Sequence, residues 1–277
     1  MVQKKTPKKV VRLAFLGSGN MAEAMIKGVI DAGLFKPSAI IISDLSDQRL
    51  QMMGEKYGVG TTRSNREAVR DGDIIIVGVK PGAVDAVLAE VRSELGKKLL
   101  ISVAAGVPLS RLASALEREA KIIRAMPNAP ALVQSGATVL SPGKGVGKES
   151  LGWVLRIFES IGKAWVLDER YLDAVTGLSG SGPAFVFLMI EAMADGGVKS
   201  GLPRDIALSL AVQTVRGAAQ LVFQTGEHPA RLKDFVASPK GTTIAGLQKL
   251  EDGKVRAAFL AAVEAAACRS GELGKGE

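Results

Sequence analysis

Short apolar runs alternate with amphipathic stretches along the first 167 residues of the chain. A parallel sheet that is buried on both faces requires this pattern, because helices must cover both of its sides. The stretch 21–32 has helical spacing and is followed by Gly33, a common residue after the end of a helix. The pattern therefore predicts a doubly wound, mostly parallel sheet. Its expected strands are 10–16, 39–43, 74–79, 99–104, 122–125, 137–140 and 164–167.

The pattern changes near residue 168, where helical spacing replaces the short β-rich runs. Helices are expected at 183–199, 203–225, 242–251 and 254–272. Pro183 and Pro203 lie where the first helical turn tolerates proline. We therefore predict a basic tail at 1–9, a sheet-containing domain at 10–167 and an all-α domain at 168–277.

A glycine-rich loop, Gly17-x-Gly19-x-x-Ala22, lies between the first expected strand and helix. The first glycine permits a tight turn, the second lets the backbone approach a pyrophosphate, and the small third residue lets helix and strand pack closely. The positive end of the helix then faces the phosphates. The loop thus predicts a Rossmann-type dinucleotide site formed by Gly17, Ser18, Gly19, Asn20 and Met21, with a purely structural turn as the alternative.

Asp44 follows the second expected strand. A carboxylate at this place usually accepts hydrogen bonds from the adenosine ribose, which favours NAD and repels a 2′-phosphate. Asp44 and Ser46 could instead only cap the next helix. Arg49 and Arg63 could still serve a phosphate, so both NADH and NADPH stay open as cofactors.

Three further loops follow expected strands on the same sheet edge, where doubly wound folds bind ligands. They begin at Val79, Ala104 and Met126. Several such loops together predict one continuous crevice.

Composition narrows the class of protein. Hydrophobic residues make up 47%, as in a globular protein, and the longest apolar runs are interrupted well before the length of a membrane span. The single cysteine fits a reducing cytoplasm. The net charge is +8, with four lysines in the first nine residues, but no basic stripe with interleaved aromatic residues follows. We expect no membrane, nucleic-acid or metal partner.

Several motifs together resemble pyrroline-5-carboxylate reductases, in the order found in that family and over nearly the whole chain. They are GSGNMA (17–22), VKPG (79–82), AAGV (104–107), MPNAPALV (126–133), GLSGSGPAFVF (177–187) and EHPARLKDFVASPKGTT (227–243). The resemblance implies NADPH- or NADH-dependent reduction of 1-pyrroline-5-carboxylate to L-proline. It also implies an intertwined homodimer, which can assemble further, with a helical domain that supplies the substrate pocket.

The resemblance also implies roles for individual residues. Thr243 matches the threonine proposed to hydrogen-bond the ring nitrogen, and is the expected catalytic residue. The other expected cofactor contacts are Asp44, Asn65, Val79, Lys80, Pro81, Ala104, Ala105, Gly106 and Asn128. The expected substrate contacts are Ser179, Gly180, Ser181, Ser238, Gly241, Thr242 and Thr243.

Two residues need separate comment. Lys240 stands where the family usually has a small residue, most often glycine, so it could point to solvent, add charge near the substrate carboxylate or narrow the pocket. His228 is the only histidine, and we expect a structural role for it at a helix start.

Two other functions compete with imine reduction. Hydroxyacid dehydrogenases of similar build have a GxxGxG segment and a lysine four residues after its last glycine, whereas Val186 occupies that position here. A non-catalytic cofactor-binding scaffold would have no reason to keep Thr243. The segment GLSGSGPAFV is therefore read as a substrate-side loop rather than a second phosphate site.

Overall fold

The computed structural model describes residues 11–116 and 120–275. The chain forms two compact units: one contains the residues up to Gly180 together with those from Ala267 onward, and the other is Ser181–Ala266. The basic tail predicted at 1–9 lies outside the described residues. The boundary predicted after Leu167 stays a prediction.

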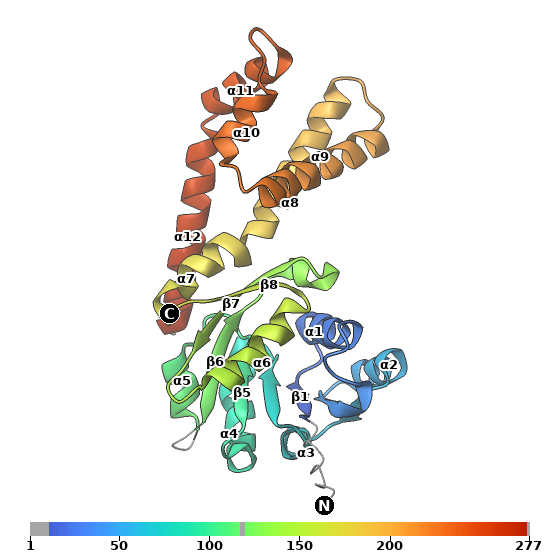
Figure 1. Cartoon of the computed structure of the whole chain (residues 1–277), viewed down its shortest axis with the longest axis vertical. Helices are drawn as coiled ribbons and strands as arrows, with labels where there is room; N and C mark the ends of the chain where they lie inside the picture. The colour runs from blue at the N-terminus through green and yellow to red at the C-terminus, as the bar shows by residue number, and fades with distance from the viewer. Residues whose placement is uncertain (1–10, 117–119, 276–277) are drawn as a thin grey trace, which may run out of the picture. The chain divides into compact units, whose positions relative to one another are not determined.

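The first unit contains an eight-stranded sheet with the order β3-β2-β1-β4-β5-β6-β7-β8 (Figure 1). All neighbouring strands are parallel except β6 and β7, so the expected mostly parallel sheet is confirmed. The strands are β1 (Leu13–Leu16), β2 (Ile40–Ser43), β3 (Gly60–Thr62), β4 (Ile74–Val77), β5 (Leu99–Ser102), β6 (Lys121–Met126), β7 (Gly136–Pro142) and β8 (Gly162–Val166). The sequence pattern missed β3 because this short edge strand has no apolar run.

Strand β1 shows why the sheet is covered on both sides. Leu13 and Phe15 belong to one buried cluster, and Ala14 and Leu16 belong to another, because successive side chains of a strand point to opposite faces. The first cluster includes residues of α1 (Asn20–Asp31), α2 (Asp47–Tyr57) and α6 (Lys148–Glu159). The second includes residues of α3 (Asn65–Asp71), α4 (Val84–Leu95) and α5 (Leu109–Ser114).

Short helical segments complete the first unit. They are four 3₁₀ turns at Pro37–Ala39, Pro81–Ala83, Ala129–Val133 and Glu169–Tyr171, then α7 (Leu172–Val175) and a π-helical turn at Thr176–Gly180. The Ser270 hydroxyl donates to Asp173 Oδ1 at 2.7 Å. This bond ties the last part of the chain to α7 within the same unit.

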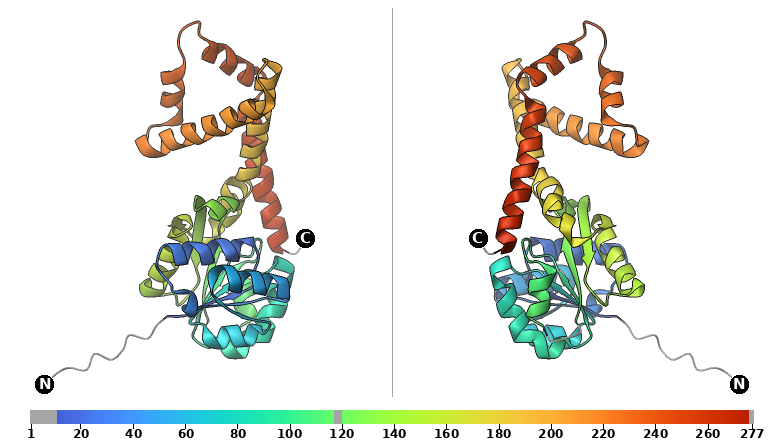
Figure 2. Two further views of the ribbon diagram at one scale, coloured as in Figure 1. Left: turned by 90° about the vertical axis from the view of Figure 1, so that its right-hand side faces the viewer. Right: turned by 90° about the vertical axis from the view of Figure 1, so that its left-hand side faces the viewer.

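The second unit consists of helices joined by short turns and loops (Figure 2). Its helices are α8 (Gly182–Lys199), α9 (Arg204–Thr225), α10 (Pro229–Val236), α11 (Thr242–Asp252) and the first part of α12 (Val255–Lys275). The four expected helices are thus confirmed to within a few residues, and α10 begins directly after His228, where a helix start was expected.

The helices of the second unit bury few side chains of the single chain. Within Ser181–Ala266, only Ala194, Ala207 and Ala211 are buried. Phe187, Leu188 and Phe235 are 63%, 67% and 82% exposed. Large apolar side chains on so many faces indicate a surface that a partner covers.

Counted over whole helices, two segments are long and apolar enough to cross a membrane by length and composition: Glu169–Lys199 with 31 residues and Arg204–Thr225 with 22. Each contains an apolar stretch of 18 residues with at most two charged residues, and two helices of this kind are weak evidence for a membrane span. Glycines and a few charges interrupt the runs but do not end the helices.

Candidate cofactor and substrate site

The glycine loop occupies the point where the strand order reverses, with β1 between β2 and β4. Gly17 has φ +99°, and a Cβ atom there would lie 3.0 Å from the carbonyl carbon of Gly78. Both the backbone conformation and the close approach of Gly78, which follows the neighbouring strand β4, therefore require glycine at residue 17. The crevice at such a point is the usual ligand site of doubly wound folds.

The N-terminus of α1 fits the pyrophosphate of a dinucleotide. Gly19 is the N-cap residue of α1, and no side chain caps the helix there. A Cβ atom on Gly19 would meet no atom within 4 Å, so the loop leaves space beside the free N–H groups of Asn20 and Met21. Open N–H groups and the helix dipole together favour an anion at this place.

Asp44 connects the end of β2 to the glycine loop. Its Oδ2 atom accepts hydrogen bonds from the Ser18 N–H at 2.7 Å and from the Ser18 hydroxyl at 2.6 Å. Its Oδ1 atom accepts from the Ser46 N–H at 2.9 Å. Burial raises the pKa of the Asp44 carboxyl group, but the hydrogen bonds from Ser18, Ser46 and Leu45 outweigh burial and hold that pKa below its ordinary value. Asp44 is therefore a charged clamp on the loop.

The alternative that Asp44 and Ser46 only cap the next helix holds for Ser46 but not for Asp44. Ser46 is the N-cap of α2 and accepts from the Arg49 N–H at 3.3 Å. Asp44 instead bonds mainly to Ser18, the residue between the two loop glycines.

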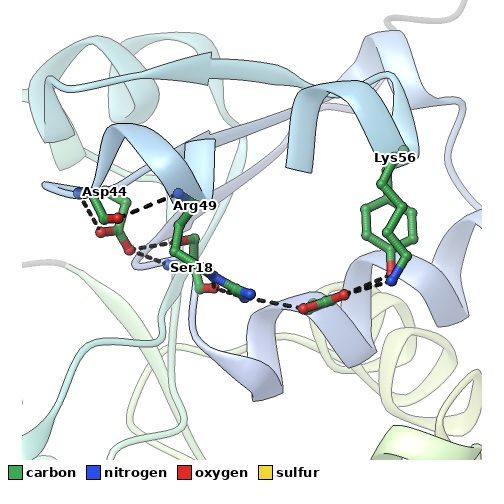
Figure 3. Close-up of polar contacts among 7 residues, drawn as sticks. Ser18, Asp44, Arg49 and Lys56 are labelled. Carbon is green, nitrogen blue, oxygen red and sulfur yellow. Dashed lines mark hydrogen bonds and ion pairs between the residues drawn. The ribbon is translucent and has the colours of Figure 1, made fainter. Parts of the chain in front are cut away.

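A second cluster of charges, which sequence spacing did not reveal, lies beside this clamp (Figure 3). Arg49 donates to the Ser18 carbonyl oxygen from Nε at 2.9 Å, and it forms an ion pair with Glu23 at 3.1 Å. Glu23 also accepts from Lys56 at 3.0 Å and from the Tyr57 hydroxyl at 3.1 Å. Because the partners come from α1 and α2, only the fold brings them together.

Asn65 is the first residue of α3, and its amide is held by two neighbours. Its Oδ1 atom accepts from the buried Ser43 hydroxyl at 2.7 Å, and its Nδ2 atom donates to Glu90 at 2.8 Å. These bonds place Asn65 beside Ser43, the last residue of β2, which directly precedes Asp44 in the chain.

The loops after β4 and β5 lie on the same edge of the sheet as the glycine loop. The Gly78 N–H donates to the Leu16 carbonyl at 2.8 Å, and the Val103 N–H donates to the Val77 carbonyl at 3.1 Å. The expected continuous edge is therefore formed by the segments that follow β1, β4 and β5. It contains the expected cofactor contacts Val79, Lys80, Pro81, Ala104, Ala105 and Gly106.

The loop after β6 binds directly to the π-helical turn. Asn128 donates from Nδ2 to the Ser179 carbonyl oxygen at 2.9 Å and accepts at Oδ1 from the Ala137 N–H at 2.8 Å. A Cβ atom on Gly180 would lie 2.8 Å from Cε of Met126. The hydroxyl of Ser179 donates to the Val175 carbonyl at 3.0 Å. The Asn128 side chain thus fixes the position of the π-helical turn Thr176–Gly180 within the first unit.

The remaining expected substrate contacts belong to the second unit. Gly241 is the N-cap residue of α11 and no side chain caps this helix, so the N–H groups of Thr242 and Thr243 lie at an open end. A Cβ atom on Gly241 would collide with the Ser238 hydroxyl, so a larger residue there would have to displace that side chain. Lys240 has φ +57°, the left-handed conformation that glycine adopts most easily. Ser181 directly precedes α8.

Two further expectations concern histidine and metals. The Nδ1 atom of His228 accepts from the Ala230 N–H at 3.2 Å, so His228 caps α10. Within the described residues no group of three or more histidine, cysteine or acidic side chains is arranged to hold a metal ion.

Fold and glycine loop together define a two-part protein with a Rossmann-type dinucleotide-binding site. Residues 12–106 match the family model described as NADP oxidoreductase, coenzyme F420-dependent, and residues 169–273 match the one described as pyrroline-5-carboxylate reductase dimerisation. The chain belongs to the pyrroline-5-carboxylate reductase family.

Individual relatives agree with this assignment over nearly the whole chain. A pyrroline-5-carboxylate reductase of Methanosarcina acetivorans is 46% identical over 95% of this chain and 98% of its own length. A solved structure of the reductase from Coxiella burnetii, 35% identical, has a TM-score of 0.90 and covers 95% of this chain and 98% of that one. The reductase structure from Plasmodium falciparum with NADP bound, 34% identical, has a TM-score of 0.87 over 95% of this chain and 98% of that one.

The family assignment explains the exposed apolar helices. The dimerisation match covers the complete second unit, and the protein self-associates as a homodimer. The apolar side chains exposed on the second unit of a single chain are those available to a second copy.

Proposed function

We propose that this protein reduces 1-pyrroline-5-carboxylate to L-proline, the last step of proline biosynthesis. Identity of 46% over 95% of the chain to a reductase of this name carries the proposal, together with a dinucleotide site at the strand reversal. When bound, NADH or NADPH supplies a hydride to the imine carbon. The chain has to orient the ring and provide a hydrogen-bond donor to its nitrogen.

The protein's own groups suit these tasks. The open N-terminus of α1 would hold the pyrophosphate, and the N–H groups at the start of α11 would hold the substrate carboxylate without an arginine. We propose that the Thr243 hydroxyl donates to the ring nitrogen. Hydride then adds to the imine carbon, and the ring nitrogen takes up one proton from solvent, so that the product is the secondary amine.

The rival hydroxyacid dehydrogenase chemistry needs a base to handle the proton of an alcohol. The position four residues after Gly182 holds Val186, an apolar residue in α8. We propose on this ground that the enzyme acts on an imine. We also place it in the cytoplasm as a soluble enzyme, since its single cysteine, Cys268, is free.

The decisive experiment follows absorbance of the reduced nicotinamide with purified protein and 1-pyrroline-5-carboxylate. Oxidation of NADH or NADPH that depends on the imine is expected, with formation of proline. A 2-hydroxy acid with the oxidised cofactor should give no reaction. Absence of imine-dependent oxidation with both cofactors would overturn the proposal.

A further inference from the structure

The edge formed by the ends of β1 and β2 carries both signs of charge in a defined arrangement (Figure 3). Asp44 faces the glycine loop through two hydrogen bonds from Ser18. Arg49 reaches the same residue from α2 and bonds to its carbonyl oxygen. In a Rossmann site a carboxylate at this place accepts from the ribose hydroxyls, whereas a nearby arginine accommodates a 2′-phosphate. The two residues therefore favour opposite cofactors.

Glu23 decides how much of the positive charge at this edge is available. Its carboxylate, in the first turn of α1, pairs with Arg49 at 3.1 Å and with Lys56 at 3.0 Å. Its side chain is 19% exposed, so the pairs are only partly screened by solvent. Arg49 is held further by the Ser18 carbonyl oxygen. A 2′-phosphate that used Arg49 would have to compete with Glu23 for it.

The remaining cation at the end of β2 is also paired. Arg63 lies 3.4 Å from Asp47 Oδ2 and 3.5 Å from the Leu45 carbonyl oxygen. Both side chains of this pair are largely exposed, so it is weak and its cation can move. Arg63 therefore stays available to a phosphate, and the preference depends on Asp44 and on the pairing of Arg49 with Glu23.

We infer that Glu23 and Asp44 together make this enzyme prefer NADH to NADPH. Asp44 offers an acceptor to the ribose hydroxyls and repels a phosphate there, while Glu23 holds Arg49 in an ion pair and so keeps it from the phosphate. This inference rests on the proposed function only in taking a nicotinamide dinucleotide as the ligand. The preference is a property of this chain's own charges, whatever cofactor its relatives use.

The test measures dissociation constants for NADH and NADPH from nicotinamide fluorescence, without substrate, on the full-length dimer. The wild type should bind NADH at least about tenfold more tightly than NADPH. Glu23→Gln should tighten NADPH binding by about tenfold, because it frees Arg49 from its ion pair, and should change NADH binding little. Asp44→Ser should weaken NADH and tighten NADPH.

Glu55→Gln is the matched control, since Glu55 lies on α2 and accepts a hydrogen bond from the exposed Gln51 at 2.8 Å. This variant should keep the dissociation constants for NADH and NADPH within about twofold of the wild-type values. Thermal unfolding of each variant checks that it is folded, and either Glu23→Gln or Asp44→Ser suffices to test the inference.

Two results would overturn the inference: equal or tighter binding of NADPH by the wild type, or an unchanged ratio of constants in both variants. Imine-dependent oxidation at saturating concentrations of each cofactor, measured in parallel, separates this failure from failure of the proposed function. A wild type that prefers NADPH but reduces the imine leaves the function intact. One that prefers NADH but oxidises neither cofactor leaves the inference intact and refutes the function.

Discussion

The side-chain amide of Asn128 donates to the main-chain carbonyl oxygen of Ser179 at 2.9 Å, across 51 residues of sequence. The bond joins the loop after β6 to the π-helical turn that precedes α8. Asn128 also accepts from the Ala137 N–H and is only 9% exposed. One side chain thus sets the position of the turn Thr176–Gly180 relative to the sheet.

Asn128→Asp tests this bond, because it keeps the acceptor for Ala137 and removes the donor to Ser179. In the variant, the Ser179 carbonyl oxygen loses its donor and faces the new carboxylate of residue 128. This change should lower the free energy of unfolding by about 1–3 kcal/mol. Urea denaturation measures the change. Asn128→Leu, which removes both bonds, should lower it at least as much. Stability equal to that of the wild type in both variants would show that the bond is unimportant.

Glu169 is expected to stabilise the first unit through a buried partner. Its Oε1 atom accepts from Arg124 at 2.9 Å and from the Leu109 N–H at 2.7 Å, and the Arg124 side chain is 8% exposed. Glu169→Gln leaves a buried guanidinium without its counter-charge and should lower the free energy of unfolding by about 1–3 kcal/mol.

The control for Glu169 is the exposed ion pair of Asp85 and Arg111, in which Asp85 Oδ2 lies 2.7 Å from a guanidinium nitrogen of Arg111. Because solvent screens this pair, Asp85→Asn should lower the free energy of unfolding by less than about 1 kcal/mol. Urea denaturation of both variants compares them directly. A larger effect of Asp85→Asn than of Glu169→Gln would contradict the role assigned to burial.

Asp44 should make stability depend on pH with a known sign. Its folded pKa lies below its ordinary value because the hydrogen bonds from Ser18 and Ser46 outweigh burial. The stabilisation is therefore complete above the unfolded pKa of about 4 and is lost as the pH falls through the folded pKa. The difference in unfolding free energy between wild type and Asp44→Asn should be largest near neutral pH and shrink in acid. A difference that grows on acidification would refute this assignment.

Thr243→Val tests the proposed donor to the ring nitrogen. Removal of the hydroxyl at nearly constant volume should lower kcat about 10- to 1000-fold, with cofactor binding and unfolding temperature nearly unchanged. Steady-state kinetics measure the loss. Thr242→Val, one residue earlier in α11, is the comparison and should affect kcat less. Unaltered kcat in Thr243→Val would remove Thr243 from the mechanism.

Lys240 and Lys254 form a natural pair for separating charge from backbone strain. Their φ angles are +57° and +55°, and Lys254 lies between α11 and α12, outside the Ser238–Thr243 loop. Replacement by glycine relieves the left-handed strain at both positions but makes the unfolded chain more flexible. The unfolding free energy should therefore change by less than about 1 kcal/mol in each variant.

Only Lys240→Gly should alter the reaction, if its ammonium group contributes to binding of the substrate carboxylate. We expect KM for the imine to rise several-fold with little change in kcat, and a dependence on salt concentration that Lys254→Gly lacks. Equal kinetic behaviour of the two glycine variants would assign Lys240 to the solvent-exposed surface alone.

The sequence by itself determined the layers of the fold and the position of the cofactor loop. Consecutive apolar runs such as Leu13–Leu16 can only be buried on both faces, and Gly17 and Gly19 allow a conformation that few other residues reach. Features of this kind depend on neighbouring residues in the chain and can therefore be predicted from the sequence. The sequence pattern did not predict the exposed strand β3, because a short edge strand needs no apolar pattern.

Only the tertiary structure decided which polar groups meet. The bonds of Asp44 to Ser18, of Glu23 to Arg49 and of Asn128 to Ser179 join residues 26, 26 and 51 positions apart. Nothing in the spacing of these residues predicts their pairing, since hydrogen bonds and ion pairs act over a few ångströms. The packing of helices on the sheet brings the partners together. Sequence thus indicated the site, and the fold determined which charges in it remain available to a ligand.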